Sequence, residues 1–152
     1  MAFQVFSSAF ADGSWIPELH SCDGADISPS LEWSGAPAET RSFTLIVEDP
    51  DAPDGIWHHW VLYDIGPRTQ ALPQGFRPGS LGITGTNDFG AAKYGGPCPP
   101  KGHGAHRYFF RLTALNVPTV GLAAGATAAE LMDAMKGHVL GEAQFMGRFE
   151  RR

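Results

Sequence analysis

The feature that most constrains the fold is a glycine- and proline-rich segment, residues 70–104, between two segments rich in β-branched and aromatic residues. Proline removes a backbone donor and is confined to strand edges and turns, so this segment predicts a long loop with no helix and no central strand. Loops of this length inside a compact domain are usually functional. The flanking segments, 57–65 and 106–115, are predicted strands.

Strands dominate the rest of the chain as well. Residues 41–49 form another predicted strand, which stops at Pro50, and the Gly/Pro-broken residues 1–37 predict short strands and turns. A capping-box pattern at Thr127–Glu130, followed by apolar residues at helical spacing, predicts one helix over residues 127–140. Alternating apolar residues in 142–149 predict a final strand. With 152 residues and no linker, we expect a single domain over residues 1–152.

The composition argues against a nucleic-acid partner and against a transmembrane segment. The formal net charge is −5, and the few lysines form no basic stripe, so nucleic acid is not an expected partner. No apolar run approaches the roughly 20 residues of a transmembrane helix, and the first residues lack a signal peptide pattern. We therefore expect a cytoplasmic protein without a transmembrane segment.

The two cysteines, Cys22 and Cys98, are too few for a disulfide framework and lack the paired spacing of a zinc site. Because cytosolic proteins are normally kept reduced, the sequence favours two free thiols. A bridge between them stays open if the two proline-rich loops that carry them meet.

Side-chain alternation places polar groups at the ends of apolar strand faces. Asp49 shares a face with apolar residues of 41–49, and His106 shares a face with Tyr108. Each of these strand ends abuts a Gly/Pro-rich loop, 49–53 or 95–104. The pattern predicts a small-ligand pocket at one edge of a sheet.

The adjacent histidines His58 and His59 must face opposite ways on a regular strand. By alternation His58 lies with Trp60, and His59 lies with Val61, so one of the two histidines can join the pocket. Histidine N–H, tyrosine O–H and loop N–H donors can hold an anion, and phosphate monoesters fit this set.

Several motifs together closely resemble the phosphatidylethanolamine-binding protein family. They are Asp-Pro-Asp-Ala-Pro at 49–53, Trp-His-His-Trp at 57–60, and Tyr-Gly-Gly-Pro-Cys-Pro-Pro-Lys-Gly at 94–102 running into His-Arg-Tyr at 106–108. Residues 27–33 and 86–90 resemble its bacterial and archaeal branch, often called Raf kinase inhibitor-like proteins. Such a joint occurrence is far more specific than any one motif.

The resemblance implies a mainly β fold, in which a large antiparallel sheet packs on a smaller one with peripheral helices, and an anion pocket at one end. Its ligand-binding residues would be Asp49, Asp51, His59, Pro100, His106 and Tyr108, with Trp57, His58 and Gly96 beside them. The family binds phosphorylated head groups and nucleotides, and members inhibit kinases or serine proteases. Two departures bear on pocket size: the segment from Pro53 to Trp57 is very short, and His103 adds a histidine.

Enzymatic alternatives use the same residues. Cys98 with His106 could act as nucleophile and base, and His103, His106 and Asp49 could hold a metal, but no helix N-terminus, paired cysteines or His-x-x-x-His pattern supports either. We therefore expect a binding protein rather than an enzyme, with no cofactor and no metal. The expected partners are a small anionic ligand and, by resemblance, a kinase or a serine protease, with the chain a monomer or a homodimer.

The expected pocket contains a conflict, because a carboxylate at Asp49 repels a phosphate. A hydrogen bond from His59 to Asp49 would favour the imidazolium, which could then donate to the anion. The sequence thus predicts anion affinity that weakens as pH rises through the pKa of the pocket histidines.

Overall fold

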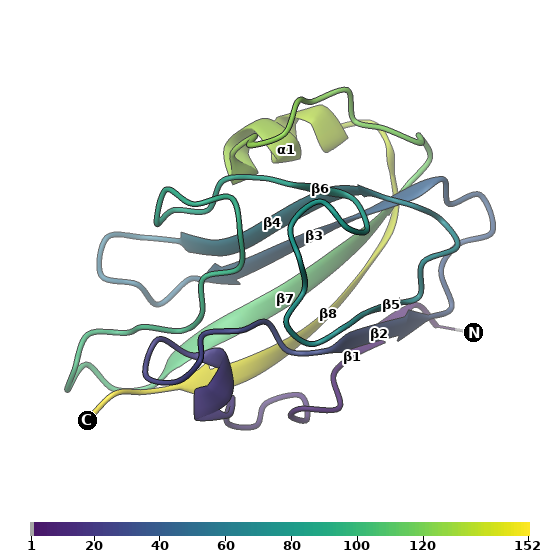
Figure 1. Ribbon diagram of the computed structural model, residues 1–152. Coiled ribbons are helices and arrows are strands. Elements are labelled where there is room, and N and C mark those ends of the chain that lie inside the picture. The colour runs from purple at the N-terminus through teal and green to yellow at the C-terminus, as the bar shows by residue number, and fades with distance from the viewer. Residues whose placement is uncertain (1) are drawn as a thin grey trace.

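The computed structural model describes residues 2–152, and its main element is a five-stranded antiparallel sheet in the order β6-β4-β3-β7-β8 (Figure 1). The strands are β3 (Ser42–Asp49), β4 (Trp57–Ile65), β6 (Ile83–Thr84), β7 (His106–Leu115) and β8 (Val139–Phe149). The central strand β3 is buried along almost its whole length. A strand buried in this way has both faces of its sheet covered.

A smaller antiparallel sheet covers one face of the large sheet (Figure 1). It consists of β1 (Gln4–Phe6), β2 (Leu31–Ser34) and β5 (Ala71–Leu72). Between the two sheets lies the larger apolar core, in which Trp33 of β2 packs its ring 5.5 Å from that of Phe43 on β3. A short 3-10 helix, η1 (Glu18–His20), follows β1.

The helix α1 (Ala128–Met135) covers the opposite face of the large sheet (Figure 1). Its apolar residues Leu131 and Met135 form a second core with Val61 and Tyr63 of β4. The predicted mainly β fold of two packed antiparallel sheets with a peripheral helix is confirmed.

The capping box begins the helix as predicted, but the helix ends earlier than residue 140. The Thr127 side chain accepts a hydrogen bond from the Glu130 amide, and the Glu130 carboxylate accepts one from the Thr127 amide. Gly137 then takes a positive φ of 82°, which ends the helix. Val139 pairs with Leu115, so β8 starts at 139 rather than 142.

The Gly/Pro-rich residues 70–104 form the expected long loop, interrupted only by the two-residue strands β5 and β6. Within residues 2–152, no helix has the length and apolar character needed to cross a bilayer.

Candidate functional site

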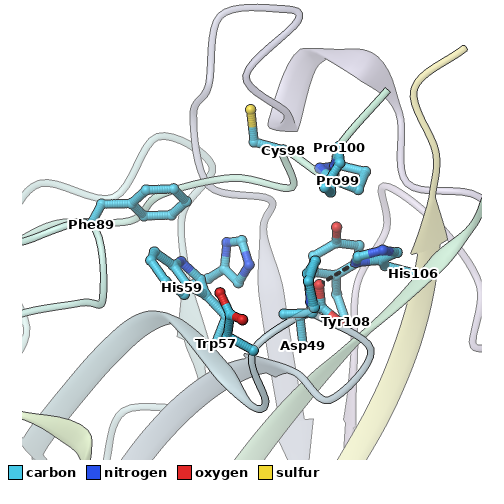
Figure 2. Close-up of a pocket in the computed structure, with 12 residues that line it drawn as sticks. Asp49, Trp57, His59, Phe89, Cys98, Pro99, Pro100, His106 and Tyr108 are labelled. Atoms are coloured by element: carbon cyan, nitrogen blue, oxygen red, sulfur yellow. Dashed lines mark hydrogen bonds and ion pairs between the residues drawn. The ribbon is translucent and has the colours of Figure 1, made fainter. Parts of the chain in front are cut away.

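A pocket of about 210 Å³ opens at the edge of the large sheet where β3 ends and β4 and β7 begin (Figure 2). Its walls come from these strand ends, from the short loop after β3 and from the Gly/Pro-rich loop. The lining residues are Asp49, Ala52, Pro53, Asp54, Trp57, His59, Phe89, Cys98, Pro99, Pro100, His106 and Tyr108. The structure therefore brings Asp49, His59, His106 and Tyr108 together, with Trp57 and Pro100 beside them.

Asp49 and His106 meet because β3 and β7 are antiparallel neighbours, so that the end of one strand lies beside the start of the other. Asp49 Oδ2 lies 2.6 Å from His106 Nδ1, and both side chains are buried. An ionised carboxylate only accepts, so His106 Nδ1 carries the proton. The expected hydrogen bond from His59 to Asp49 is therefore wrong. The antiparallel pairing of β3 with β7 places His106, not His59, within bonding distance of Asp49.

His59 enters the pocket through a β-bulge. Val47 pairs with Trp60 and Glu48 pairs with His58, so His59 has no partner residue on β3. One extra residue breaks strict alternation at that point and re-aims the side chain. His59 therefore lines the pocket on the same side as Trp60, although alternation alone grouped it with Val61.

The environment of His59 favours the neutral imidazole. Its Nδ1 lies 2.8 Å from the Gly95 carbonyl oxygen, which can only accept, so Nδ1 is the protonated nitrogen. Burial lowers the pKa of His59 below its usual 6.5, and the Gly95 carbonyl partly offsets this shift. The ring also stands edge-on to Tyr108, with 5.2 Å between the ring centroids. In the neutral form Nε2 is left as an acceptor.

His58 lies outside the pocket, on the opposite side of the strand. Its ring contacts Asp88 at 3.0 Å and Glu48 at 3.7 Å. The expectation that His58 belongs beside the ligand is not supported by this position, because the bulge exchanges the sides that the two histidines would have on a regular strand.

Two buried donors in the pocket have no protein partner within residues 2–152: the Tyr108 hydroxyl and Trp57 Nε1. Tyr108 is 1% exposed, and its hydroxyl points across the pocket towards Pro99 and Pro100 (Figure 2). Burial, helped by the charge of Asp49, raises the pKa of Tyr108 far above its usual range, so the hydroxyl keeps its proton. A buried unpaired hydroxyl is costly and calls for an explanation.

Asp51 and Gly96, two other predicted site residues, do not line this pocket. The Asp51 carboxylate accepts hydrogen bonds from the backbone and the guanidinium of Arg107, and this pairing lowers its pKa. Gly96 lies in the same loop as Cys98 but does not line the pocket, and its amide donates to Asp26 at 2.7 Å. Both residues support neighbouring loops.

His103 and Phe89 belong to the site, although the predicted ligand-binding set does not include them. His103 Nδ1 lies 2.7 Å from His106 Nε2, which extends the Asp49–His106 pair to the surface. Phe89 packs edge-on against Trp57 and His59 and forms one side of the pocket. Both residues lie in the Gly/Pro-rich segment, where no strand or helix periodicity indicates which way a side chain points.

Cys22 and Cys98 form a disulfide, so the predicted free thiols are wrong. The two loops meet, with a Cα–Cα distance of 5.4 Å, and the Cys22 amide donates to the Pro97 carbonyl at 3.1 Å. This contact spans 76 residues of sequence, so no local pattern could reveal it. It also leaves Cys98 without the thiolate that the thiol-enzyme alternative requires.

Comparison with known proteins agrees with this architecture. Residues 6–150 match the family model described as Phosphatidylethanolamine-binding protein. A UPF0098 protein of Aquifex aeolicus is 48% identical over 151 residues, covering 97% of this chain and 88% of the relative.

Two solved structures are similar over almost the whole chain. The crystal structure of CT736 from Chlamydia trachomatis, described as a homologue of phosphatidylethanolamine-binding protein, has 40% identity and a TM-score of 0.92 and covers 99% of each chain. E. coli YbcL, described as a new member of the mammalian PEBP family, has 32% identity and a TM-score of 0.92 with 100% coverage of both chains. With the pocket in place and the likeness spanning residues 6–150, this chain belongs to the phosphatidylethanolamine-binding protein family.

Proposed function

We propose that the pocket binds a small phosphorylated or otherwise anionic ligand, of the phospholipid head-group or nucleotide class. The observation that carries this proposal is the Tyr108 hydroxyl, which is buried at the pocket and has no partner among the described residues. An anion that accepts its proton would offset the desolvation of that hydroxyl.

Two further groups can add donors around the same anion. Trp57 Nε1 is a second unpaired N–H in the pocket wall. His59 becomes a third donor when its Nε2 takes a proton, because Nδ1 is already held by Gly95. Hydrogen bonds from such donors to an ionised acceptor are among the stronger ones in proteins.

Both oxygens of the Asp49 carboxylate are held by hydrogen-bond donors within the site. His106 donates Nδ1–H to the carboxylate, and the Asp51 amide donates to its other oxygen at 2.7 Å. A carboxylate bonded in this way repels an anion less than a free one would.

We propose binding without turnover. The alternative is a hydrolase in which the Asp49–His106 pair activates water, and it predicts release of inorganic phosphate from the bound ester. His106 Nε2 is engaged by His103 rather than aimed at a substrate, which favours binding. Phosphate release that the wild-type protein catalyses and His106→Ala abolishes would establish the hydrolase instead.

The wider roles stay predictions. Regulation of a kinase and inhibition of a serine protease follow from family resemblance alone, and activity assays with purified enzymes of both classes test them. Whether the chain is a monomer or a homodimer is tested by light scattering. A cytoplasmic location also stays a prediction, and the disulfide is more typical of oxidising compartments, so cell fractionation has to decide it.

Calorimetric titration with phosphoethanolamine and with adenosine monophosphate tests the binding proposal. We expect saturable binding of at least one of the two, and Tyr108→Phe should weaken it by about tenfold or more, because a hydrogen bond to a charged group contributes about 1.5–3 kcal/mol. The absence of heat with both ligands, or an unchanged affinity in Tyr108→Phe, would overturn the proposal.

Tyr63→Phe is the matched control. Tyr63 lies in the second core under α1, and its hydroxyl already donates to the Ala123 carbonyl. Removing that hydroxyl should lower the free energy of unfolding by about 1 kcal/mol and leave affinity unchanged. Tyr108→Phe should weaken affinity without lowering the free energy of unfolding, because its hydroxyl has no partner among the described residues to lose.

A further inference from the structure

One side of the pocket is a wall, residues 94–100, that rests on a supporting loop, residues 18–26. Three hydrogen bonds join them: Tyr94 Oη to the His20 carbonyl at 2.7 Å, the Gly96 amide to Asp26 at 2.7 Å, and the Cys22 amide to the Pro97 carbonyl at 3.1 Å. The Cys22–Cys98 disulfide is the only covalent link between wall and loop within residues 2–152.

The wall is also bonded directly to His59. The Gly95 amide donates to the His59 carbonyl at 2.9 Å, and the His59 ring donates to the Gly95 carbonyl at 2.8 Å. Cys98, Pro99 and Pro100 of the same wall line the pocket. A change in the position of the wall therefore reaches both the shape of the pocket and its histidine.

The disulfide is open to attack. Cys22 is an exposed residue and Cys98 is partly exposed, so the bridge lies at the surface and not in either apolar core. Exposed disulfides are the ones that tend to be labile or regulatory. Arg151 Nη1 lies 3.1 Å from Cys98 Sγ, and the Arg151 guanidinium also pairs with Asp23 of the supporting loop at 3.4 Å.

We propose that Cys22–Cys98 is a reversible thiol–disulfide exchange site, and that its reduction weakens the affinity of the neighbouring pocket for its anionic ligand. The second half of the proposal rests on the proposed function of that pocket. The co-reactant is a low-molecular-weight thiol or dithiol.

The exchange proceeds in two balanced steps. The external thiolate attacks the sulfur of Cys22, the more exposed residue of the two, forming a mixed disulfide, and Cys98 leaves as a thiolate beside Arg151. A second thiolate then attacks the external sulfur of the mixed disulfide, releasing Cys22 as a thiolate and the reductant as its own disulfide. Two electrons pass to the protein, two external thiols are oxidised, and the two protons they give up are available to the cysteines. The guanidinium favours Cys98 as the leaving group because it stabilises the thiolate.

Reduction weakens the pocket for two physical reasons. Without the covalent link the wall is held to the supporting loop only by non-covalent contacts, namely the three hydrogen bonds and the Arg151 bridge to Asp23, so the pocket is less well preorganised. A Cys98 thiolate also adds negative charge to the lining of a site that must hold an anion. Coupling between two such sites is typically worth about 5- to 150-fold in affinity.

The coupling must act in both directions. If reduction weakens ligand binding by about tenfold, saturating ligand must make the disulfide harder to reduce by the same factor, which for this two-electron couple is a shift of about 30 mV. This reciprocity separates true coupling from a side effect of the reductant.

The test compares oxidised wild-type protein with the same protein in dithiothreitol, using phosphoethanolamine as the probe. We expect about tenfold weaker binding after reduction and faster hydrogen exchange at the Gly95 and Gly96 amides, whose acceptors are His59 and Asp26. Equal affinity and equal exchange in the two redox states would overturn the proposal.

Two variants separate the two causes. Cys22→Ser loses the bridge and keeps the Cys98 thiol in the pocket, whereas Cys22→Ser/Cys98→Ser loses both. We expect both variants to bind more weakly than the oxidised protein, with Cys22→Ser the weaker, and dithiothreitol to have no effect on the double variant. If circular dichroism shows that either variant is unfolded, the comparison of oxidised with reduced wild-type protein decides the proposal.

The outcome also distinguishes this proposal from the proposed function. If the oxidised protein binds neither phosphoethanolamine nor adenosine monophosphate but reduction still accelerates exchange at Gly95 and Gly96, the redox site is supported and the ligand class is wrong. If the oxidised protein binds the probe and reduction changes neither affinity nor exchange, the ligand class is supported and the redox site is overturned.

Discussion

Asp49 and His106 form a buried hydrogen-bonded pair, with 2.6 Å between Oδ2 and Nδ1, although they lie 57 residues apart in the sequence. The pair fixes the tautomer of His106 and directs its Nε2 towards His103, 2.7 Å away. The edge of the pocket is therefore a hydrogen-bonded array of one carboxylate and two imidazoles. Among the described residues, the side chains of His59 and Tyr108 make no hydrogen bond to that array, although the Tyr108 ring stacks on that of His106.

Asp49→Asn should destabilise the fold while keeping its shape. The variant replaces the charged carboxylate, which accepts hydrogen bonds from the His106 ring and the Asp51 amide, with a neutral amide. We expect the free energy of unfolding to fall by about 1.5–3 kcal/mol. Urea denaturation followed by tryptophan fluorescence measures it. Asp51→Asn is the control, because its partner Arg107 is exposed, and it should lose less. Equal losses in the two variants would contradict this account.

His59 should make the protein less stable as the solution becomes mildly acidic. Burial lowers its pKa in the folded state below the value of about 6.5 in the unfolded chain, so folding favours the neutral ring. Its contribution to stability is therefore fully present above about pH 6.5 and is lost as pH falls from there towards the lower folded pKa.

Unfolding free energies of the wild type and His59→Gln between pH 7.5 and 5 measure this contribution. The wild type should show the steeper loss. The pKa of Asp51 is also lowered by folding, so its contribution to stability is lost mainly as pH falls below about 3.8, the value in the unfolded chain. That range lies below the window used here. Parallel curves for the two proteins would show that His59 does not titrate on unfolding.

Anion binding should draw a proton onto His59. The neutral ring offers only the acceptor Nε2 to the pocket, so it must be protonated before it can donate to an anion. Affinity should rise as pH falls from 8 towards 5.5. Because a phosphate monoester itself titrates near pH 6, the informative quantity is the difference between the wild type and His59→Gln. Calorimetry in buffers of different ionisation enthalpy should show more proton uptake by the wild type, and equal uptake would refute a role for His59.

Gly96→Ala should disturb the pocket wall. A Cβ there would lie 2.0 Å from the His20 carbonyl oxygen and 2.5 Å from the Asp26 carboxylate, so the wall and the supporting loop would have to separate. We expect a lower melting temperature and weaker ligand binding. Gly66→Ala is the matched control, since its Cβ would meet only the Thr69 hydroxyl at 3.9 Å and its φ is not positive. A Gly96→Ala protein as stable as Gly66→Ala would contradict the packing described.

The sequence by itself determined the elements that depend on local pattern. The strand segments 57–65 and 106–115 are β4 and β7 with the same bounds, because segments rich in β-branched and aromatic residues and bordered by Gly/Pro-rich sequence favour extended strands. The capping box likewise begins α1 at the predicted residue. The face that carries Asp49, His106 and Tyr108 also followed from alternation, since β3 and β7 are regular at that end.

Only the tertiary structure decided the features that depend on contacts between distant segments. Alternation grouped His59 with Val61, but a β-bulge, which arises from the pairing of β3 with β4, turned His59 into the pocket. The hydrogen-bond partner of Asp49 and the pairing of Cys22 with Cys98 were likewise set by which loops meet in space. Local propensity acts over a few residues and carries no information about contacts between segments that are distant in the sequence. Burial of the common core is what brings these segments within bonding distance.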